Sequence, residues 1–328
     1  MYVDVALDSI ITYAITVGAS DIHFDPILNG IQVRLRIDGL LTEYMLVDAT
    51  DADMLVNRIK VFSGMDISEK RLPQDGRWEW SVKSYAVTMR VSSLPSLYGE
   101  AIVCRLMGNE GVHKNLLELG MDVELQEKIA ALLKRPYGLI TICGPTGSGK
   151  TATLYAMLRM LNLKETKLIC LEDPVEATIE GAIQIGINEK IGFTFSKGLR
   201  TVLRQDPDSI MIGEIRDNET AQLAVKAALT GHRVITTVHT NTALGVIGRL
   251  VDMGVEPYLL HATLIGSLSQ RLVRRIDSTT HSYQGRLGLF EYLEIPFSDI
   301  DWDHVEQYMF TSLQDSAHLA INSGITTL

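Results

Sequence analysis

The chain has 328 residues, of which 46% are hydrophobic and 21% are charged, and its formal net charge is -10. This length allows about two domains with well-buried cores, and the composition is typical of an ordinary soluble globular protein. The negative charge argues against a protein that coats nucleic acid non-specifically, because such binding needs a summed positive field.

No targeting or cross-linking signal stands out. No apolar run approaches the ~20 residues that a membrane-spanning helix needs. The N-terminal segment carries Asp4 and Asp8 but no Lys or Arg, whereas a signal peptide begins with positive charge, so we expect a cytoplasmic chain. Cys104, Cys143 and Cys170 lie singly in apolar runs typical of buried strands, and the chain has no CxxC pair. We therefore predict neither a disulfide framework nor a zinc site.

The first hundred residues predict a small α+β domain. Apolar residues at helical spacing predict a helix over residues 3–16. IQVRLRIDG (31–39) alternates apolar and polar residues and predicts a half-buried strand, and DMLVNRIKVFSG (53–64) predicts a helix that Gly64 ends. WEWSV, YAVTMRVSSL and AIVCRLM predict further strands. This order favours an α+β domain over residues 1–108.

A change of pattern marks the second domain. Residues 109–115 lack apolar periodicity and are predicted to form a linker. From there, over residues 116–328, helical stretches alternate with the short apolar runs YGLITICG, KLICLE, DSIMIG and HRVITTVH. Continuous apolar strands are typical of a sheet buried on both faces, so this alternation predicts a mainly parallel sheet with helices on both sides. The last residues, 300–328, are predicted to form helices.

A phosphate-binding loop follows the first of these strands. The sequence GPTGSGKTA matches the pattern G-x-x-x-x-G-K-[ST] between a predicted strand and a predicted helix. Backbone N–H groups of such a loop surround the phosphates of ATP, Lys150 is expected to reach the β- and γ-phosphates, and the Thr151 hydroxyl is expected to bind Mg²⁺. The predicted nucleotide-binding residues are Gly144, Pro145, Thr146, Gly147, Ser148, Gly149, Lys150, Thr151 and Ala152.

Acidic residues follow two of the later strands. LICLEDPVE ends its strand at Glu172, Asp173 and Glu176, and carboxylates at such strand ends face the ligand crevice of open α/β sheets. They could hold Mg²⁺ through water or orient the attacking water; a solvated acidic turn is the alternative. In DSIMIGEIRD the strand ends at Gly213, so the usual acidic pair is reduced to Glu214.

Several neighbouring residues admit two interpretations. Arg216 and Asp217 are equally consistent with an ion pair at a helix start and with a role in catalysis. In TGHRVITTVHTNTA, His232 is better explained as a structural residue. His239 follows the strand at the end expected to face the nucleotide, where it could sense the γ-phosphate through a hydrogen bond.

These stretches, in this order, resemble the secretion ATPases that power type IV pili and type II secretion. LEDPVE, GEIRD and TGHRVITTVHTN are similar to the acidic, Walker B and histidine boxes of that family. VGASDIHFDP, VRLRIDG, RVSSLPSLYGE and QRLVRR extend the likeness over nearly the whole chain. The resemblance implies a RecA-like P-loop ATPase core with a C-terminal helical subdomain and a smaller N-terminal α+β (PAS-like) domain.

The resemblance also implies a homohexamer in which the N-terminal domain packs on a neighbouring core. By their positions in the motifs, Arg90 and Arg105 resemble the arginines that neutralise charge on the γ-phosphate; Arg77 is a weaker candidate, and a basic strand face in water is the alternative. Glu172 is implied as the residue that activates water and Glu214, with Asp173, as the Mg²⁺ partner, although the two glutamates could exchange these roles.

Two departures bear on the subfamily. The similarity begins near residue 8, without the long N-terminal domain of many assembly ATPases, and RRIDSTTHSYQGRLGLFEYL lacks their zinc-binding CxxC pairs. His281 alone cannot hold zinc. These features resemble the assembly ATPases of Gram-positive competence pili, which serve DNA uptake, and retraction ATPases of type IV pili share them. ASDIHFDP, VRLRIDG and GRLGLFEYL resemble the assembly branch more closely. A pilus retraction ATPase and a type II secretion ATPase are the alternatives within the family.

The resemblance implies that ATP hydrolysis drives mechanical movement. A ring on the cytoplasmic face of the membrane would act on a polytopic platform protein, with other cytoplasmic assembly factors as further partners and no direct nucleic-acid binding. Two other classes stay open: a nucleic-acid motor with the same core, which the acidic charge and 6% aromatic content oppose, and an ATP-binding scaffold that does not hydrolyse ATP, which the reduced Walker B motif would permit.

Overall fold

In the computed structural model the chain divides into two compact units, Met1–Glu110 and Gly111–Leu328. The structure describes residues 3–82, 85–107, 111–296, 298 and 300–327. Of the predicted linker, residues 109 and 110 lie outside the described residues, and residues 111–115 belong to the second unit. Among the described residues, no helix has both the length and the hydropathy needed to cross a membrane.

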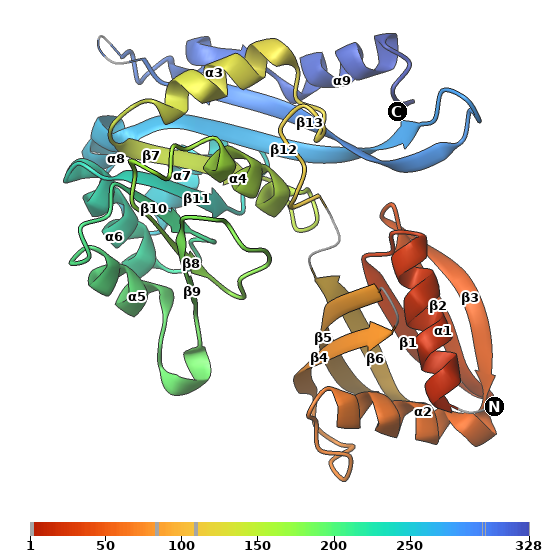
Figure 1. The fold of residues 1–328 in the computed structure, drawn as a ribbon. Helices are drawn as coiled ribbons and strands as arrows, with labels where there is room; N and C mark the ends of the chain where they lie inside the picture. Colours follow the sequence, from red (N-terminus) through yellow and green to blue (C-terminus); the bar gives the residue numbers. More distant parts are fainter. Residues whose placement is uncertain (1–2, 83–84, 108–110, 297, 299, 328) are drawn as a thin grey trace. The chain divides into compact units, whose positions relative to one another are not determined.

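The first unit is a six-stranded antiparallel sheet with two helices (Figure 1). Its strand order is β3-β2-β1-β6-β5-β4. The helices contribute to one buried cluster with every second residue of the strands, including Trp78, Met89 and Leu106. Its elements are α1 (Val3–Thr16), β1 (Asp21–Ile27), β2 (Gly30–Ile37), β3 (Leu40–Asp48), α2 (Ala49–Phe62), β4 (Gln74–Val82), β5 (Tyr85–Ser96) and β6 (Gly99–Met107).

The predicted elements of this unit are present, and β1 and β3 are additional. DIHFDPI pairs with β2 and β6 and buries Ile22 and Phe24, although Pro26 obscures its strand pattern in the sequence. The tight approach of β2 to β3 depends on Gly30, which has φ +143°. A Cβ atom there would lie 2.0 Å from the Val47 carbonyl oxygen, so only glycine fits.

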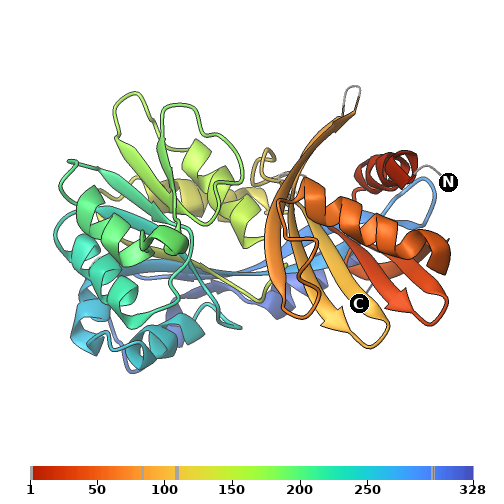
Figure 2. The same ribbon diagram turned by 90° about the horizontal axis from the view of Figure 1, so that it is seen from below.

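The second unit, drawn from yellow to blue in Figure 2, contains an eight-stranded sheet of order β14-β13-β12-β7-β11-β10-β8-β9. The pairs from β12 to β9 are parallel, and β13 and β14 add antiparallel strands at one edge. The strands are β7 (Gly138–Cys143), β8 (Leu168–Glu172), β9 (Ile183–Gly186), β10 (Ser209–Ile212), β11 (Arg233–Val238), β12 (Leu264–Ile276), β13 (Tyr283–Glu294) and β14 (Met309–Thr311).

Helices cover both faces of this sheet, as predicted. Leu139 and Val234 pack with α5 and α6 in one buried cluster, whereas their neighbours Ile140 and Ile235 pack with α3 and α4 in another. Alternate residues of the same strands therefore enter different cores. The helices are α3 (Val123–Leu133), α4 (Lys150–Arg159), α5 (Phe195–Val202), α6 (Asn218–Leu229), α7 (Gly245–Asp252), α8 (Pro257–Thr263) and α9 (Leu313–Asn322), with 3-10 turns η1 (Glu189–Ile191) and η2 (Val305–Tyr308).

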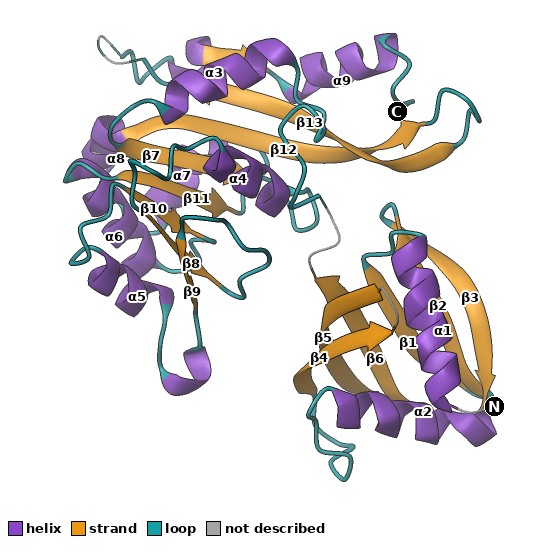
Figure 3. Cartoon of the chain, in the orientation of Figure 1, coloured by secondary structure: helices purple, strands orange, loops and turns teal. Residues whose placement is uncertain are grey.

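The C-terminal part differs from the predicted helical subdomain. Residues 264–294 form the long hairpin of β12 and β13 (Figure 3). Within 300–327, α9 confirms one predicted helix, but η2 is a single turn and β14 is a strand that pairs with β13. The helical prediction was wrong for residues 309–311 because Met-Phe-Thr finds an open strand edge, and a capping box at Ser312 and Asp315 starts the helix only after it.

A buried ion pair in the first unit yields a stability prediction. Lys60 Nζ lies 2.8 Å from Glu100 Oε1 and 2.7 Å from the Glu69 carbonyl oxygen, and its side chain is 0% exposed. Glu100→Ala is expected to lower the free energy of unfolding by about 3–5 kcal/mol, because it leaves the Lys60 ammonium buried and unpaired. Urea unfolding measures this loss.

Two further variants test that cause. Lys60→Met combined with Glu100→Leu is expected to recover most of the stability, since neither charge is then left buried. Glu79→Ala, which removes the partner of exposed Arg77, should leave unfolding unchanged. A loss below about 1 kcal/mol for Glu100→Ala would contradict the account.

Candidate functional site

The phosphate loop lies between the end of β7 and the start of α4. Gly144, Gly147 and Gly149 have φ values of +146°, +77° and +86°, which glycine adopts without strain. A Cβ atom on Gly144 would lie 2.5 Å from Ser148 Oγ, and one on Gly149 would lie 2.7 Å from Gln270 Nε2. The glycines therefore let the loop pack tightly against β12. The backbone N–H groups of the loop lie at the N-terminus of α4.

Donors converge on this loop. Lys150 is buried, and its Nζ donates to the carbonyl oxygens of Gly144 at 2.8 Å and Pro145 at 2.9 Å. Burial lowers the pKa of Lys150, because removal from water disfavours the charged ammonium form. Ser148 Oγ is buried and has no hydrogen-bond partner among the described residues. A phosphate chain would supply acceptors for both groups, so the residues present fit a nucleoside triphosphate.

The other predicted loop residues divide by exposure. Pro145, Thr146 and Gly147 form the exposed crest of the loop, and Ala152 is buried in the first turn of α4. Thr151 is half-buried and directly follows Lys150. Its hydroxyl thus lies at the N-terminus of the helix, where the partial positive charge of the helix favours a bound anion with its cation.

The acidic and histidine motifs meet at the same edge of the sheet. β8, β10 and β11 are parallel to β7, and Ile212 of β10 lies beside Leu171 of β8. The residues that follow these strands, Glu214 and His239 together with Glu172 at the end of β8, therefore lie at the carboxyl edge, as does the phosphate loop after β7. This edge is where open α/β sheets bind ligands.

Glu214 is the centre of a charged cluster. Its Oε1 accepts a hydrogen bond from Arg216 at 2.5 Å, and its Oε2 lies 3.4 Å from His239 Nε2. Arg216 also lies 3.8 Å from Asp173. Burial alone would raise the pKa of Glu214, but the hydrogen bond and charge of Arg216, with His239, outweigh it and hold that pKa below its ordinary value. The carboxylate is thus ionised and partly open to solvent, with 20% exposure.

Glu172 has a different environment. Its side chain is 3% exposed. The Tyr155 hydroxyl donates to Glu172 Oε2, and Gln184 Nε2 donates to Oε1 at 2.9 Å. Burial raises the pKa of Glu172, against the smaller lowering influence of these hydrogen bonds. Both carboxylate oxygens therefore have partners within the protein.

The structure separates the residues that the sequence left ambiguous. Asp217 caps α6 by accepting from the Thr220 backbone N–H at 2.8 Å, so it is a structural residue, and Arg216 pairs with Glu214 instead. His232 Nδ1 lies 2.9 Å from the Ala227 carbonyl oxygen and serves the turn after α6. His239, in contrast, is 44% exposed beside Glu214.

The predicted arginines lie in the first unit. Arg77, Arg90 and Arg105 occupy facing positions on β4, β5 and β6, on the sheet face opposite the buried cluster. Arg105 pairs with Asp21 at 2.8 Å. Arg90 is exposed and has no ion-pair partner among the described residues. Like charges directly opposite each other destabilise a sheet, so this row of arginines is suited to an anionic partner.

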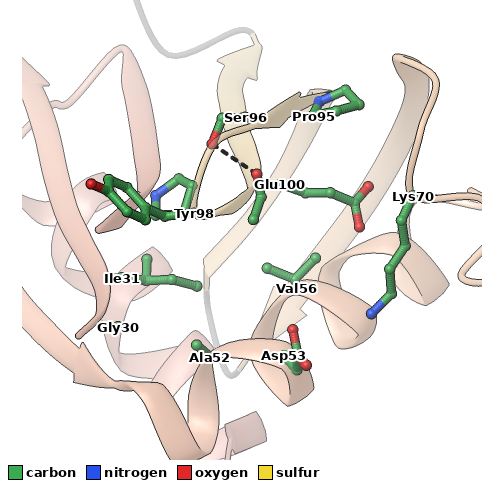
Figure 4. A pocket seen from close by; sticks show the side chains of 12 residues that line it. Gly30, Ile31, Ala52, Asp53, Val56, Lys70, Pro95, Ser96, Tyr98 and Glu100 are labelled. Carbon is green, nitrogen blue, oxygen red and sulfur yellow. Dashed lines mark hydrogen bonds between the residues drawn. The ribbon is translucent and has the colours of Figure 1, made fainter. Parts of the chain in front are cut away.

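A small pocket of about 140 Å³ also lies in the first unit, between α2 and the turns after β1 and β5 (Figure 4). Asp53, Lys70 and Glu100 contribute charge to its lining, but Glu100 is already paired with Lys60. Pockets for ligands the size of a nucleotide have volumes of roughly 300–1,000 Å³. This pocket is therefore too small to be the nucleotide site.

Sequence reasoning missed three residues whose side chains support the acidic segment and the helix after the phosphate loop. The buried Tyr155 and the half-buried Gln184 donate to Glu172, and the buried Gln270 accepts from Thr153 in α4. Tyr155 lies within an apolar helix and Gln184 within a short edge strand, where the sequence shows no distinctive pattern. The sequence signal that could have found them is a polar residue within an apolar segment, because a buried polar group needs a hydrogen-bond partner.

Comparison with known sequences gives a consistent result. The model of the type II/IV secretion system protein family matches residues 2–316. The type II secretion system protein E of Klebsiella pneumoniae is 49% identical over 270 residues, which are 82% of this chain and 54% of the relative. The type II secretion system ATPase E of Vibrio cholerae is 47% identical over 270 residues, with the same shares of 82% and 54%. The chain spans about half the length of the curated relatives it matches.

Solved structures confirm the predicted fold class. The ATPase DotB of Legionella pneumophila superposes with a TM-score of 0.78 at 23% identity, over 98% of this chain and 93% of that chain. The pilus retraction motor PilT with bound ADP superposes with a TM-score of 0.70 at 28% identity, over 98% and 94% of the two chains. The likeness to DotB concerns the fold alone. Both agree with an α/β ATPase core in the second unit.

Proposed function

The chain belongs to the type II/IV secretion system protein family, and from this premise we propose that it is a motor that hydrolyses ATP to assemble a pilus-like filament. The observation that carries the proposal is the common carboxyl edge of the parallel strands, where the glycine-rich loop with Lys150 follows β7 and Glu214, paired with Arg216, follows β10. That arrangement provides both a phosphate cradle and a carboxylate for water.

We infer the following division of labour at the ATP site. Lys150 exchanges its contacts with the loop carbonyls for the β- and γ-phosphates. Glu214 orients the attacking water, because it is ionised and partly open, and His239 beside it senses the γ-phosphate. Thr151, with Glu214 and Asp173 through water, would hold Mg²⁺, which neutralises charge on the phosphates when bound. Glu172, with both oxygens occupied by Tyr155 and Gln184, holds the acidic segment in place, which favours Glu214 over Glu172 as the residue that activates water.

The proposed assembly is a homohexamer on the cytoplasmic face of the membrane. Arg90 and Arg105 of one subunit would neutralise charge on the γ-phosphate held by its neighbour. The position of Arg90 directly opposite Arg105 on adjacent strands supports this role. ATP binding and release would then change the shape of the ring. Its partners would be a polytopic inner-membrane platform protein and cytoplasmic assembly factors, not nucleic acid.

The finer proposal concerns which secretion or pilus system the motor drives. The resemblance of ASDIHFDP, VRLRIDG and GRLGLFEYL to the assembly branch, together with a stretch between Arg271 and Phe290 that lacks cysteine, supports a competence pilus used for DNA uptake. Relatives named for type II secretion, at 47–49% identity, favour a secretion machine as the second candidate. The full-length likeness to a pilus retraction motor keeps retraction as a third.

A chromosomal Lys150→Ala variant tests these proposals. Surface filaments, DNA uptake and secreted proteins are counted in the same cells, with exposed Lys164→Ala as the control. We expect filaments and DNA uptake to disappear, because a phosphate loop without its lysine cannot bind the β- and γ-phosphates productively.

The other outcomes assign another machine. Loss of secretion with normal filaments and uptake would indicate type II secretion, and an accumulation of filaments would indicate retraction. If filaments, uptake and secretion all match the wild type, the motor proposal is wrong.

A further inference from the structure

Tyr155 connects the helix of the phosphate loop to the acidic segment. It lies five residues after Lys150 in α4, and its side chain is fully buried. Its hydroxyl donates to Glu172 Oε2 and accepts from the backbone N–H groups of Glu176 at 3.2 Å and Ala177 at 3.3 Å. One hydroxyl therefore uses its donor and both acceptor positions on residues 172–177.

Gln184 of β9 completes the attachment from the other side. Its Nε2 donates to Glu172 Oε1 at 2.9 Å and to the Ala177 carbonyl oxygen at 2.8 Å, and its Oε1 accepts from the Ile179 N–H at 2.8 Å. The Glu172 carboxylate is thus clamped between α4 and β9. The next residue, Asp173, lies within 3.8 Å of Arg216, which in turn contacts Glu214.

The geometry of α4 connects this clamp to the phosphate loop. Thr151 and Tyr155 are four residues apart, so they project from the same side of α4, one turn from each other. The Tyr155 side chain therefore links the N-terminal part of α4, where phosphates would bind, to the acidic segment. Phenylalanine would fill the same volume, so the contribution particular to tyrosine is the hydroxyl.

We propose that Tyr155 is a positioning residue that couples the phosphate loop to the acidic segment, holding Glu172 so that Asp173 faces Arg216 and Glu214. This inference rests on the proposed ATP hydrolysis for its kinetic consequence. Its structural consequence, the protection of the Glu176 and Ala177 amides by one hydroxyl, does not depend on hydrolysis.

Tyr155→Phe tests the coupling, and Tyr292→Phe is a matched control. Tyr292 is also fully buried in the same unit, but its hydroxyl has no hydrogen-bond partner among the described residues. In the full chain, hydrogen–deuterium exchange of the peptide covering residues 173–182 should become at least about tenfold faster in Tyr155→Phe and stay unchanged in Tyr292→Phe. With MgATP, kcat should fall roughly ten- to a hundredfold while KM stays within about twofold, because a misplaced acidic segment slows the reaction without removing the phosphate cradle.

The outcomes separate this inference from the proposed function. If the wild-type chain does not hydrolyse ATP, the proposed function fails, and the exchange measurement still decides whether the hydroxyl holds the segment. If the wild type is active but Tyr155→Phe matches Tyr292→Phe in exchange and kcat, the positioning role is refuted. A rise in KM with unchanged kcat also refutes it, since that would place Tyr155 in nucleotide binding. Should Tyr155→Phe fail to fold, Gln184→Met removes the opposite side of the clamp, and the same exchange and kcat changes are required of it.

Discussion

Glu214→Gln is expected to lower kcat for ATP hydrolysis by roughly a hundred- to ten-thousandfold while leaving ATP affinity within a few-fold of the wild type. The amide keeps the size of the side chain and can still accept the hydrogen bond from Arg216, so the cluster at the strand ends should persist. It removes the negative charge that orients a water molecule. Phosphate release measures kcat, and equilibrium binding of a fluorescent ATP analogue measures affinity.

Comparison with Glu172→Gln makes this prediction specific. Glu172 is buried with both oxygens engaged, so its variant should lose less kcat than Glu214→Gln and should instead loosen residues 173–182. Exposed Glu219→Gln, which weakens the ion pair with Arg200 away from the cluster around Glu214, should behave as the wild type. If Glu172→Gln loses more kcat than Glu214→Gln at unchanged affinity, Glu172 is the residue that activates water.

The same pair of glutamates shows what the sequence could and could not predict. Both were recognisable because each follows an apolar strand beside a phosphate loop, a local pattern. Their different environments come from Tyr155, Gln184, Arg216 and His239, which lie on other elements. Which side chains meet across packed elements is a property of tertiary packing, and apolar periodicity contains no information about it.

The fold shows the same limit. The buried parallel strands were predictable because continuous apolar runs have few alternatives. β14 and the 3-10 turn η2 were not, because three residues become a strand only when the edge of β13 is available to pair with them. Likewise, the sequence indicated Arg90 and Arg105, but their alignment with Arg77 across adjacent strands depends on register, which the turns and the buried face determine.

Arg90→Ala is expected to reduce kcat by roughly a thousandfold or more, the effect typical of an arginine that neutralises charge on a transferring phosphoryl group. ATP affinity should change little, because the phosphate loop with its own lysine is intact. Arg77→Ala should lose less, since that side chain is already paired with Glu79. Arg58→Ala, whose guanidinium pairs with Asp4 between the helices of the first unit, is the control and should retain full activity.

Mixing two inactive variants tests whether Arg90 acts on the nucleotide of a neighbouring subunit. Arg90→Ala has an intact phosphate loop, and Lys150→Ala has intact arginines. In a ring assembled at random from equal amounts, roughly a quarter of the sites would combine a working loop with a working arginine of the neighbour, so partial ATP hydrolysis should return. An arginine that acts within its own subunit would give no such recovery, because every subunit in the mixture then lacks one of the two groups. Recovery in the mixture, with neither variant active alone, would therefore support both the oligomer and the shared site, whereas a mixture as inactive as its components would contradict the shared site.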